Sequence, residues 1–203
     1  MSTDFSNLIN TKTIKRGTKC AAAFEFIFET VRCADYSSPS AMVDALCTRY
    51  ESYTKKTNST NGKVFEAVLA TVLLKHGVYP LFVQAKVVFV PNVNFDFILY
   101  AEEFGPISIS AKTSLRERYK QADLEAVSLK YVHRKAKCFL VTLHKEEANN
   151  LSKKVKNSEM LGIDEVILAT SLDFDNLIVR LQTMRFIKPV AVEVITATKV
   201  LTA

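Results

Sequence analysis

The sequence predicts an α/β fold in which a mixed central β-sheet is flanked by helices. One reason is the order of the periodic segments, which runs as helix, three strands, helix, strand, helix, strand. A second is that residues 81–90 are rich in β-branched and aromatic residues, as strands are, and that residues 138–143 have the pattern of a buried strand. A third is the length of 203 residues, 48% of them apolar, which suits one domain with a substantial core.

We expect a single domain over residues 1–203, beginning with an N-terminal helical part over residues 1–51. Residues 21–31 have few helix breakers, and Pro39 opens a second helical stretch over residues 40–50. Residues 52–63 are polar, basic and rich in breakers, which predicts a loop. The α/β core then spans residues 64–203, and its first segment is an amphipathic helix that ends near Gly77.

The rest of the core alternates strands and helices. Strands are predicted over residues 81–90, 94–100 and 107–111, the last of them after a turn at Gly105-Pro106. A helix from residue 115 to about residue 137 precedes the strand 138–143. The remaining predicted segments are helix 145–157, strand 166–169, helix 173–184 and strand 190–195.

Charge and composition narrow the function classes. Lys and Arg number 27 against 21 Asp and Glu, and a net charge of +6 permits a polyanionic partner without requiring one. No apolar run approaches the ~18–20 residues that a membrane span needs. The first residues lack the basic-then-apolar order of a signal peptide, and the four cysteines lack metal-site spacing. We therefore expect a cytoplasmic protein with no membrane partner and with reduced thiols.

Three polar residues of the second and third strands are candidates for chemistry. Asp96 lies in the middle of an apolar strand, where a carboxylate is costly to bury unless it is paired or binds a metal. Ser110 and Lys112 share one face of the next strand by the two-residue period. A short hairpin would therefore present Asp96, Ser110 and Lys112 together. A carboxylate beside a lysine suits a phosphodiesterase that uses Mg²⁺.

Each of these residues also has an ordinary structural interpretation. Asp96 alone could be a solvated residue near a turn, and Lys112 alone could be an exposed strand end. The functional interpretation gains from the three residues as a set and from the helix that comes after them in the chain. Arg118, Ala122 and Glu125 are spaced to share one face of that helix. If that face turns to the sheet, Glu125 could complete the metal site.

The start of that helix is unusual. Ser114 and Glu117 have the spacing of a capping box, which alone could explain Glu117. Arg116 and Arg118, however, place two cations where the helix dipole disfavours them. A local conflict of this kind indicates a ligand-facing role. Arg can bind guanine with two hydrogen bonds and Glu can accept one from cytosine, so this segment is equipped to read G·C pairs in double-stranded DNA.

The stretch that includes Asp96, Ser110, Lys112 and TSLRERYKQADLE resembles the PD-(D/E)xK nucleases. More narrowly, it resembles the type II restriction endonucleases that read sites containing CC and GG. In that subgroup a Ser or Cys replaces the acid before the lysine, and the following helix supplies a carboxylate. Here Ser110 stands at that position, and Glu125 lies thirteen residues after Lys112. Asn94-Phe95 departs from the family pattern, which has a proline before the aspartate.

The resemblance implies a single nuclease domain with a restriction-endonuclease-like core, and a role for each matching residue. Asp96 and Glu125 would ligand Mg²⁺, Lys112 would position the attacking water, and Ser110 would be a neighbouring polar group. Glu66 resembles the auxiliary acid of an earlier helix, although it could equally lie on a solvated face. Base reading would fall to Arg116 and Glu117, whereas Arg118 could instead support the scissile phosphate or the active-site acids. The predicted DNA-binding set is Arg116, Glu117, Arg118, Lys120 and Gln121.

A two-fold symmetric site would require a homodimer, although a monomer that nicks each strand in turn is possible. A restriction enzyme would work beside a cognate DNA methyltransferase in a prokaryotic cell. Two alternatives stay open. One is another PD-(D/E)xK nuclease, for repair or modified DNA. The other is a catalytically silent DNA-binding module, which Ser110 in place of an acid favours.

Overall fold

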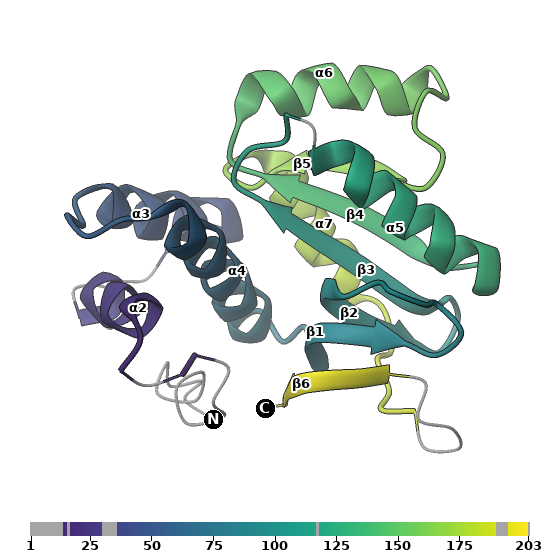
Figure 1. The fold of residues 1–203 in the computed structure, drawn as a ribbon, viewed down its shortest axis with the longest axis horizontal. Helices are drawn as coiled ribbons and strands as arrows, with labels where there is room; N and C mark the ends of the chain where they lie inside the picture. Colours follow the sequence, from purple (N-terminus) through teal and green to yellow (C-terminus); the bar gives the residue numbers. More distant parts are fainter. Residues whose placement is uncertain (1–13, 16, 30–35, 117, 190–194, 203) are drawn as a thin grey trace.

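The computed structural model describes residues 14–15, 17–29, 36–116, 118–189 and 195–202 (Figure 1). Three helices, α2 (Lys19–Glu29), α3 (Pro39–Glu51) and α4 (Asn58–Lys75), lie together at the left of the figure. Ser38 caps α3 by accepting a hydrogen bond from the Ala41 N–H, and Pro39 opens the helix as predicted. These helices form the N-terminal side of the molecule.

The predicted loop over residues 52–63 is wrong in its second half, because α4 begins at Asn58. A capping box explains the earlier start. The Thr57 hydroxyl accepts from the Thr60 N–H at 3.2 Å, and the Thr60 hydroxyl accepts from the Thr57 N–H at 2.8 Å. These bonds satisfy two N–H groups at the helix start, so a polar, breaker-rich stretch is helical before the apolar face begins at Val64.

The described strands form one six-stranded sheet in the order β5-β4-β3-β2-β1-β6. β3 pairs with β4 and β4 with β5 in parallel, whereas the other pairs are antiparallel. The predicted mixed sheet is therefore confirmed. The strands are β1 (Leu81–Val87), β2 (Phe95–Ala101), β3 (Gly105–Lys112), β4 (Lys137–Thr142), β5 (Glu165–Leu168) and β6 (Ile195–Leu201). Of the strand predicted over residues 190–195, residues 190–194 lie outside the described part, and β6 continues beyond it.

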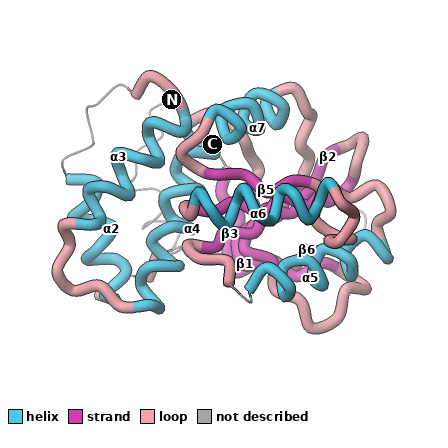
Figure 2. The backbone as a smooth tube through the Cα atoms, turned by 90° about the horizontal axis from the view of Figure 1, so that it is seen from above, coloured by secondary structure: helices cyan, strands magenta, loops and turns pink. Residues whose placement is uncertain are grey.

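Helices cover both faces of this sheet. α5 (Arg118–Val132) and α6 (Lys145–Lys156) pack on one face, where Cys138 and Leu140 of β4 are buried. α4 and α7 (Leu172–Gln182) pack on the other face, against Phe139 and Val141. Seen from above, the strands lie between α7 and α5 (Figure 2). The alternating burial of β4 is the two-sided pattern expected for a central strand with helices on both faces.

Two features join the helices to the rest of the fold. The Asp175 carboxylate of α7 accepts from the Ser40 N–H at 2.7 Å and from the Ser40 hydroxyl at 2.8 Å, which ties α7 to the start of α3. The Asp123 carboxylate of α5 accepts from the N–H groups of Gly162 and Ile163 ahead of β5. Within the described residues, no helix combines the length and apolarity of a membrane span.

Candidate active site

Asp96, Ser110 and Lys112 lie together where β2 and β3 pair. The register sets Phe97 opposite Ile109, which places Asp96 opposite Ser110. Asp96 Oδ2 accepts from Ser110 Oγ at 3.2 Å and from Lys112 Nζ at 2.6 Å. The backbone N–H of Ala111 donates to the same oxygen at 2.9 Å. The predicted grouping of the three residues is therefore present in the structure, whereas their catalytic roles stay predictions.

The ion pair between Asp96 and Lys112 is largely withdrawn from solvent. The side chains are 10% and 17% exposed, respectively. A charge-assisted hydrogen bond is stronger where water is partly excluded. The donors all converge on Oδ2, and Oδ1 receives no hydrogen bond from a described residue. The arrangement therefore fixes the carboxylate in place and leaves one oxygen for another ligand.

Glu125 reaches this pair from α5. Its Oε1 accepts from Gln121 Nε2 at 2.7 Å. Burial raises the pKa of the Glu125 carboxyl, and the negative charge of Asp96 adds to the rise. The Gln121 hydrogen bond and the positive charge of Lys112 oppose this rise. Glu125 is thus close enough to Lys112 and Asp96 to feel both charges. Ala122, one turn earlier, is buried. The predicted face turns to the sheet at Ala122 but not at Arg118, which is exposed, and the role of Glu125 as a metal ligand stays a prediction.

Glu66 approaches from α4, on the opposite face of the sheet. Gln84 Nε2 of β1 donates to Glu66 Oε2 at 3.0 Å. Burial raises the pKa of Glu66 to about 7, and the negative charge of Asp96 adds to the rise. The pKa of Glu66 is lowered in part by the positive charge of Lys112, by the Gln84 hydrogen bond and by the charge of Lys63. Glu66 therefore lies within electrostatic reach of Asp96 and does not occupy a fully solvated helix face.

Gln84 belongs to this site and was missed by the sequence reasoning. It lies opposite Asp96 in the β1–β2 register, with a φ of 49°, and Asn94 Nδ2 donates to its Oε1 at 2.6 Å. The paired residues Val83 and Phe97 are buried in the core under α4. The paired residues Ala85 and Phe95, which lie nearer to the hairpin turn, are buried in the core under α5. The side chains therefore change faces at Gln84 and Asp96. A left-handed conformation in a non-glycine strand residue carries no reliable sequence signal.

The carboxylates of the site suit Mg²⁺ in an open mode of binding. Among the residues that the structure describes, no group of three or more His, Cys, Asp or Glu side chains is arranged to hold a metal ion. Mg²⁺ does not need such a group, because it is commonly bound by one or two carboxylates while keeping several waters and taking substrate phosphate oxygens. Asp96 and Glu125 are of the right chemical type for this role. They do not form a closed, all-protein metal cage.

The segment before α5 differs from the prediction. Ser114 is not the N-cap, because α5 begins at Arg118 and Arg116 has a φ of 22°, outside helical conformation. Instead the Glu147 carboxylate of α6 accepts from the Leu115 N–H at 2.6 Å and from Ser114 Oγ at 3.5 Å. The Leu115 side chain is 1% exposed. A distant carboxylate and a buried leucine therefore anchor this turn, and Glu147 was also missed from the sequence.

The predicted DNA-reading side chains lie on the surface beyond this anchor. Arg116, Arg118, Lys120 and Gln121 are exposed. Glu117 lies outside the described residues. Because Arg116 precedes α5, the cations that the described residues place in the first turn of the helix are Arg118 and Lys120. Lys154 of α6 lies over the Tyr119 ring at 5.7 Å from its centre, which adds a second link between this segment and α6.

The fold is similar to that of a solved restriction endonuclease. The complex of restriction endonuclease PspGI with substrate DNA matches this chain with a TM-score of 0.59 and 15% sequence identity. The match covers 85% of this chain and 95% of that chain. It confirms the predicted restriction-endonuclease-like α/β fold. No protein-family model and no curated protein matches the sequence.

Proposed function

We propose that this protein is a Mg²⁺-dependent endonuclease that hydrolyses double-stranded DNA at a specific site containing CC/GG. The observation that carries the proposal is the contact of 2.6 Å between Lys112 Nζ and Asp96 Oδ2, with Glu125 within reach of both charges. The likeness to the fold of restriction endonuclease PspGI, solved with substrate DNA, supports the same reaction class. The finer assignment to the CC/GG subgroup rests on the sequence resemblance.

The side chains have distinct parts in the proposed reaction. Asp96 and Glu125 would hold Mg²⁺, which when bound supplies Lewis acidity toward the phosphate and a more acidic water. Lys112 would orient the attacking water and stabilise the charge that builds on the phosphate oxygens. The Ser110 hydroxyl and the Ala111 N–H keep Asp96 in one position by their hydrogen bonds to Oδ2. The new bond joins water oxygen to phosphorus, while the bond to the leaving sugar oxygen breaks.

Recognition would fall to the exposed segment before and within the first turns of α5. Arg116 and Glu117 would read G·C pairs in the major groove, with Arg118, Lys120 and Gln121 contacting bases or the backbone. The anchor from Glu147 to Leu115 and Ser114 gives this segment a defined position relative to the catalytic lysine, only a few residues away. We further propose a homodimer, a cognate DNA methyltransferase as its partner in the system, and a cytoplasmic place in a prokaryotic cell.

A catalytically silent DNA-binding module is the second candidate. It is favoured by Ser110, which stands where many nucleases have an acid, and by the lack of a three-ligand cluster among the described side chains. The electrostatic influence of Lys112 and Asp96 on Glu125 supports the nuclease, in which the Glu125 carboxylate would replace the missing acid.

The experiment that tests the proposal is digestion of a long unmethylated DNA duplex with Mg²⁺ and, separately, with EDTA. Fragment ends are then sequenced. Discrete ends that share a CC/GG-containing site, formed only with Mg²⁺, would support the restriction enzyme. Salt-sensitive binding without cleavage would favour the silent module. Random ends would favour another nuclease of this fold. For Arg116→Ala we expect discrimination of a G·C pair to fall by ~1–3 kcal/mol.

A further inference from the structure

A cleft on the α4 side of the sheet leads to the candidate active site. Its volume is about 760 Å³, and it lies between the starts of α2 and α4 and strands β1 and β2. Glu66, Gln84 and Asp96 line the part of it that belongs to the candidate active site. The cleft is also lined by Ile14, Lys15 and Thr18, which precede α2 and are far in sequence from the residues of the candidate active site. Its walls therefore come from the N-terminal helical part as well as from the core.

Charge is divided along this cleft. Its carboxylates are Glu66 and Asp96, both in the candidate active site. Its cations are three lysines. Lys15 precedes α2, Lys19 is the first residue of α2, and Lys63 belongs to α4. All three lysines are exposed, and none forms an ion pair with a described residue. The carboxylates of Glu66 and Asp96 at one end of the cleft suit a divalent cation, whereas the lysines of its walls suit an anionic ligand.

The helix geometry adds to the positive potential of the walls. α2 begins at Lys19 and α4 at Asn58, so the positive ends of two helix dipoles lie beside the same cleft. The hydroxyls of Thr18 and Ser59 also line it and could donate hydrogen bonds to phosphate oxygens. Lys63 is one turn before Glu66 on α4 and its charge lowers the pKa of that carboxyl, so the basic and acidic parts are continuous.

We propose that this cleft binds the sugar–phosphate backbone of a DNA strand next to the cleavage position, with Lys15, Lys19 and Lys63 contacting successive phosphates. The inference rests on the proposed function, because the strand it describes is the substrate of that reaction. It adds a sequence-independent contact surface made by the N-terminal helices, separate from the base-reading segment near Arg116. These lysines set affinity, whereas the segment near Arg116 sets sequence preference.

The test is the salt dependence of DNA binding, measured with Ca²⁺ in place of Mg²⁺. Dissociation constants for one duplex are determined at several salt concentrations for the wild type and for Lys15→Gln, Lys19→Gln and Lys63→Gln. Each lost phosphate contact should reduce the slope of log affinity against log salt by about 0.9. The loss of affinity should be equal for a duplex with the cleavage site and one without it. Lys63→Arg should keep the wild-type slope, because it keeps the charge.

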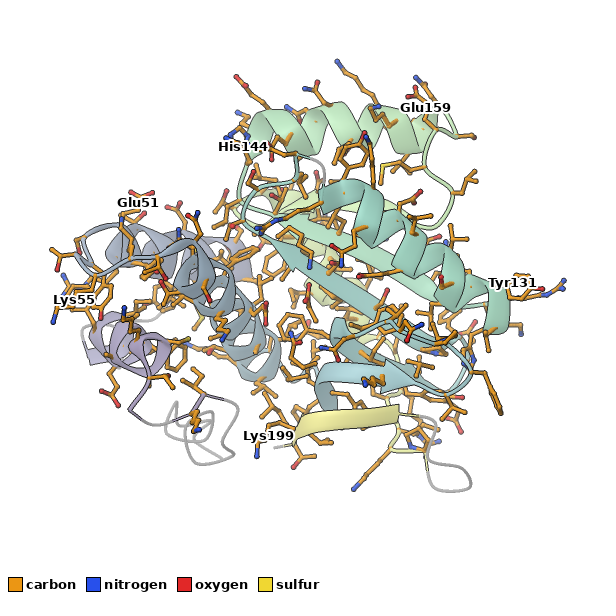
Figure 3. The ribbon with its side chains drawn as sticks, viewed as in Figure 1. Glu51, Lys55, Tyr131, His144, Glu159 and Lys199 are labelled. Carbon is orange, nitrogen blue, oxygen red and sulfur yellow. The ribbon has the colours of Figure 1, made fainter. Side chains whose placement is uncertain are left out.

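Lys135→Gln is the matched control. Lys135 is exposed in the turn after α5. Tyr131, near that end of α5, lies on the right of Figure 3, whereas α2, which borders the cleft, lies on the left of Figure 1. Replacement of Lys135 should therefore leave the slope unchanged. Unchanged slopes for the three cleft variants, with wild-type binding intact, would overturn the cleft assignment and leave the nuclease proposal standing. A wild type that neither binds nor cleaves DNA would overturn both. Equal melting temperatures would show that the variants fold.

Discussion

Asp96 and Lys112 lie on paired strands of the sheet, whereas Glu66 and Glu125 come from helices on opposite faces and lie within electrostatic reach of both. The strand pair is fixed by the β2–β3 register and by three donors to one oxygen. Each helix-borne acid has a single side-chain hydrogen bond within the described residues, from Gln84 or Gln121. Burial raises the pKa of both acids.

The difference indicates a division of labour. The sheet provides an ion pair whose hydrogen-bond donors all come from β3. The helices bring carboxylates whose ionisation is disfavoured in the free protein, and a bound cation would reverse that preference. We therefore expect loss of Asp96 or Lys112 to lower the cleavage rate at any pH and Mg²⁺ concentration. For Glu66 and Glu125 we expect effects that change with pH and with Mg²⁺ concentration.

The largest expected effect comes from removing the strand cation. Lys112→Met should lower the cleavage rate by ~10²–10³-fold, because it removes the charge that we propose stabilises the reacting phosphate. Binding of the duplex in Ca²⁺ should persist. The matched control is Lys86→Met, since Lys86 is an exposed lysine of β1. Single-turnover cleavage measures the effect, and a rate within a few-fold of wild type would place the chemistry elsewhere.

The next effect tests whether α5 supplies a ligand. Glu125→Gln removes the charge while keeping the shape, and should lower cleavage by ~10²-fold at low Mg²⁺, with a partial recovery at high Mg²⁺. Leu124→Gln, on the exposed side of the same helix, should cleave normally. The rate is measured as a function of Mg²⁺ concentration. An unchanged Mg²⁺ dependence in Glu125→Gln would remove Glu125 from the metal site.

A third effect concerns the buried acid on α4. The pKa of Glu66 is raised from 4.5 to about 7, so the unfolded chain ionises first and the folded state loses stability as pH rises between these values. Glu66→Gln should therefore stabilise the protein more at pH 8 than at pH 4, by at most ~3 kcal/mol. Urea unfolding at both pH values measures it. The matched control is Glu51→Gln, because Glu51 is exposed at the end of α3 (Figure 3).

The smallest expected effect concerns the Glu147 anchor of the segment that we propose reads DNA. Glu147→Ala leaves the Leu115 N–H without its acceptor and should cost ~2 kcal/mol of unfolding free energy. It should also reduce the preference for the cognate site over a site with one changed base pair. Glu147→Gln keeps an acceptor oxygen and should restore part of both. Glu146→Ala, at an exposed neighbouring position, is the control. Full discrimination in Glu147→Ala would show that the anchor does not position the reading residues.

Much of the fold could be predicted because its signals are local. The apolar run of β4 predicts a strand, and Pro39 predicts the start of α3, without knowledge of any distant residue. The boundaries of α4 and α5 were not, because they depend on side-chain caps or anchors. At α4 the cap is Thr57, whose hydrogen-bonding partner is a threonine where the usual capping box has Glu or Gln. At α5 the anchor is Glu147, 32 residues from Leu115.

The grouping of Asp96, Ser110 and Lys112 was already specified by the local sequence, because a two-residue period and a tight turn leave a hairpin few ways to pair. Which helix-borne groups join these three residues depends instead on tertiary packing. Gln84 meets Glu66 across 18 residues, and Glu147 meets the segment before α5 across a longer separation. The cleft likewise exists because α2 and α4 pack beside β1 and β2. Such contacts depend on how buried apolar surfaces dock, which no local pattern of residues specifies.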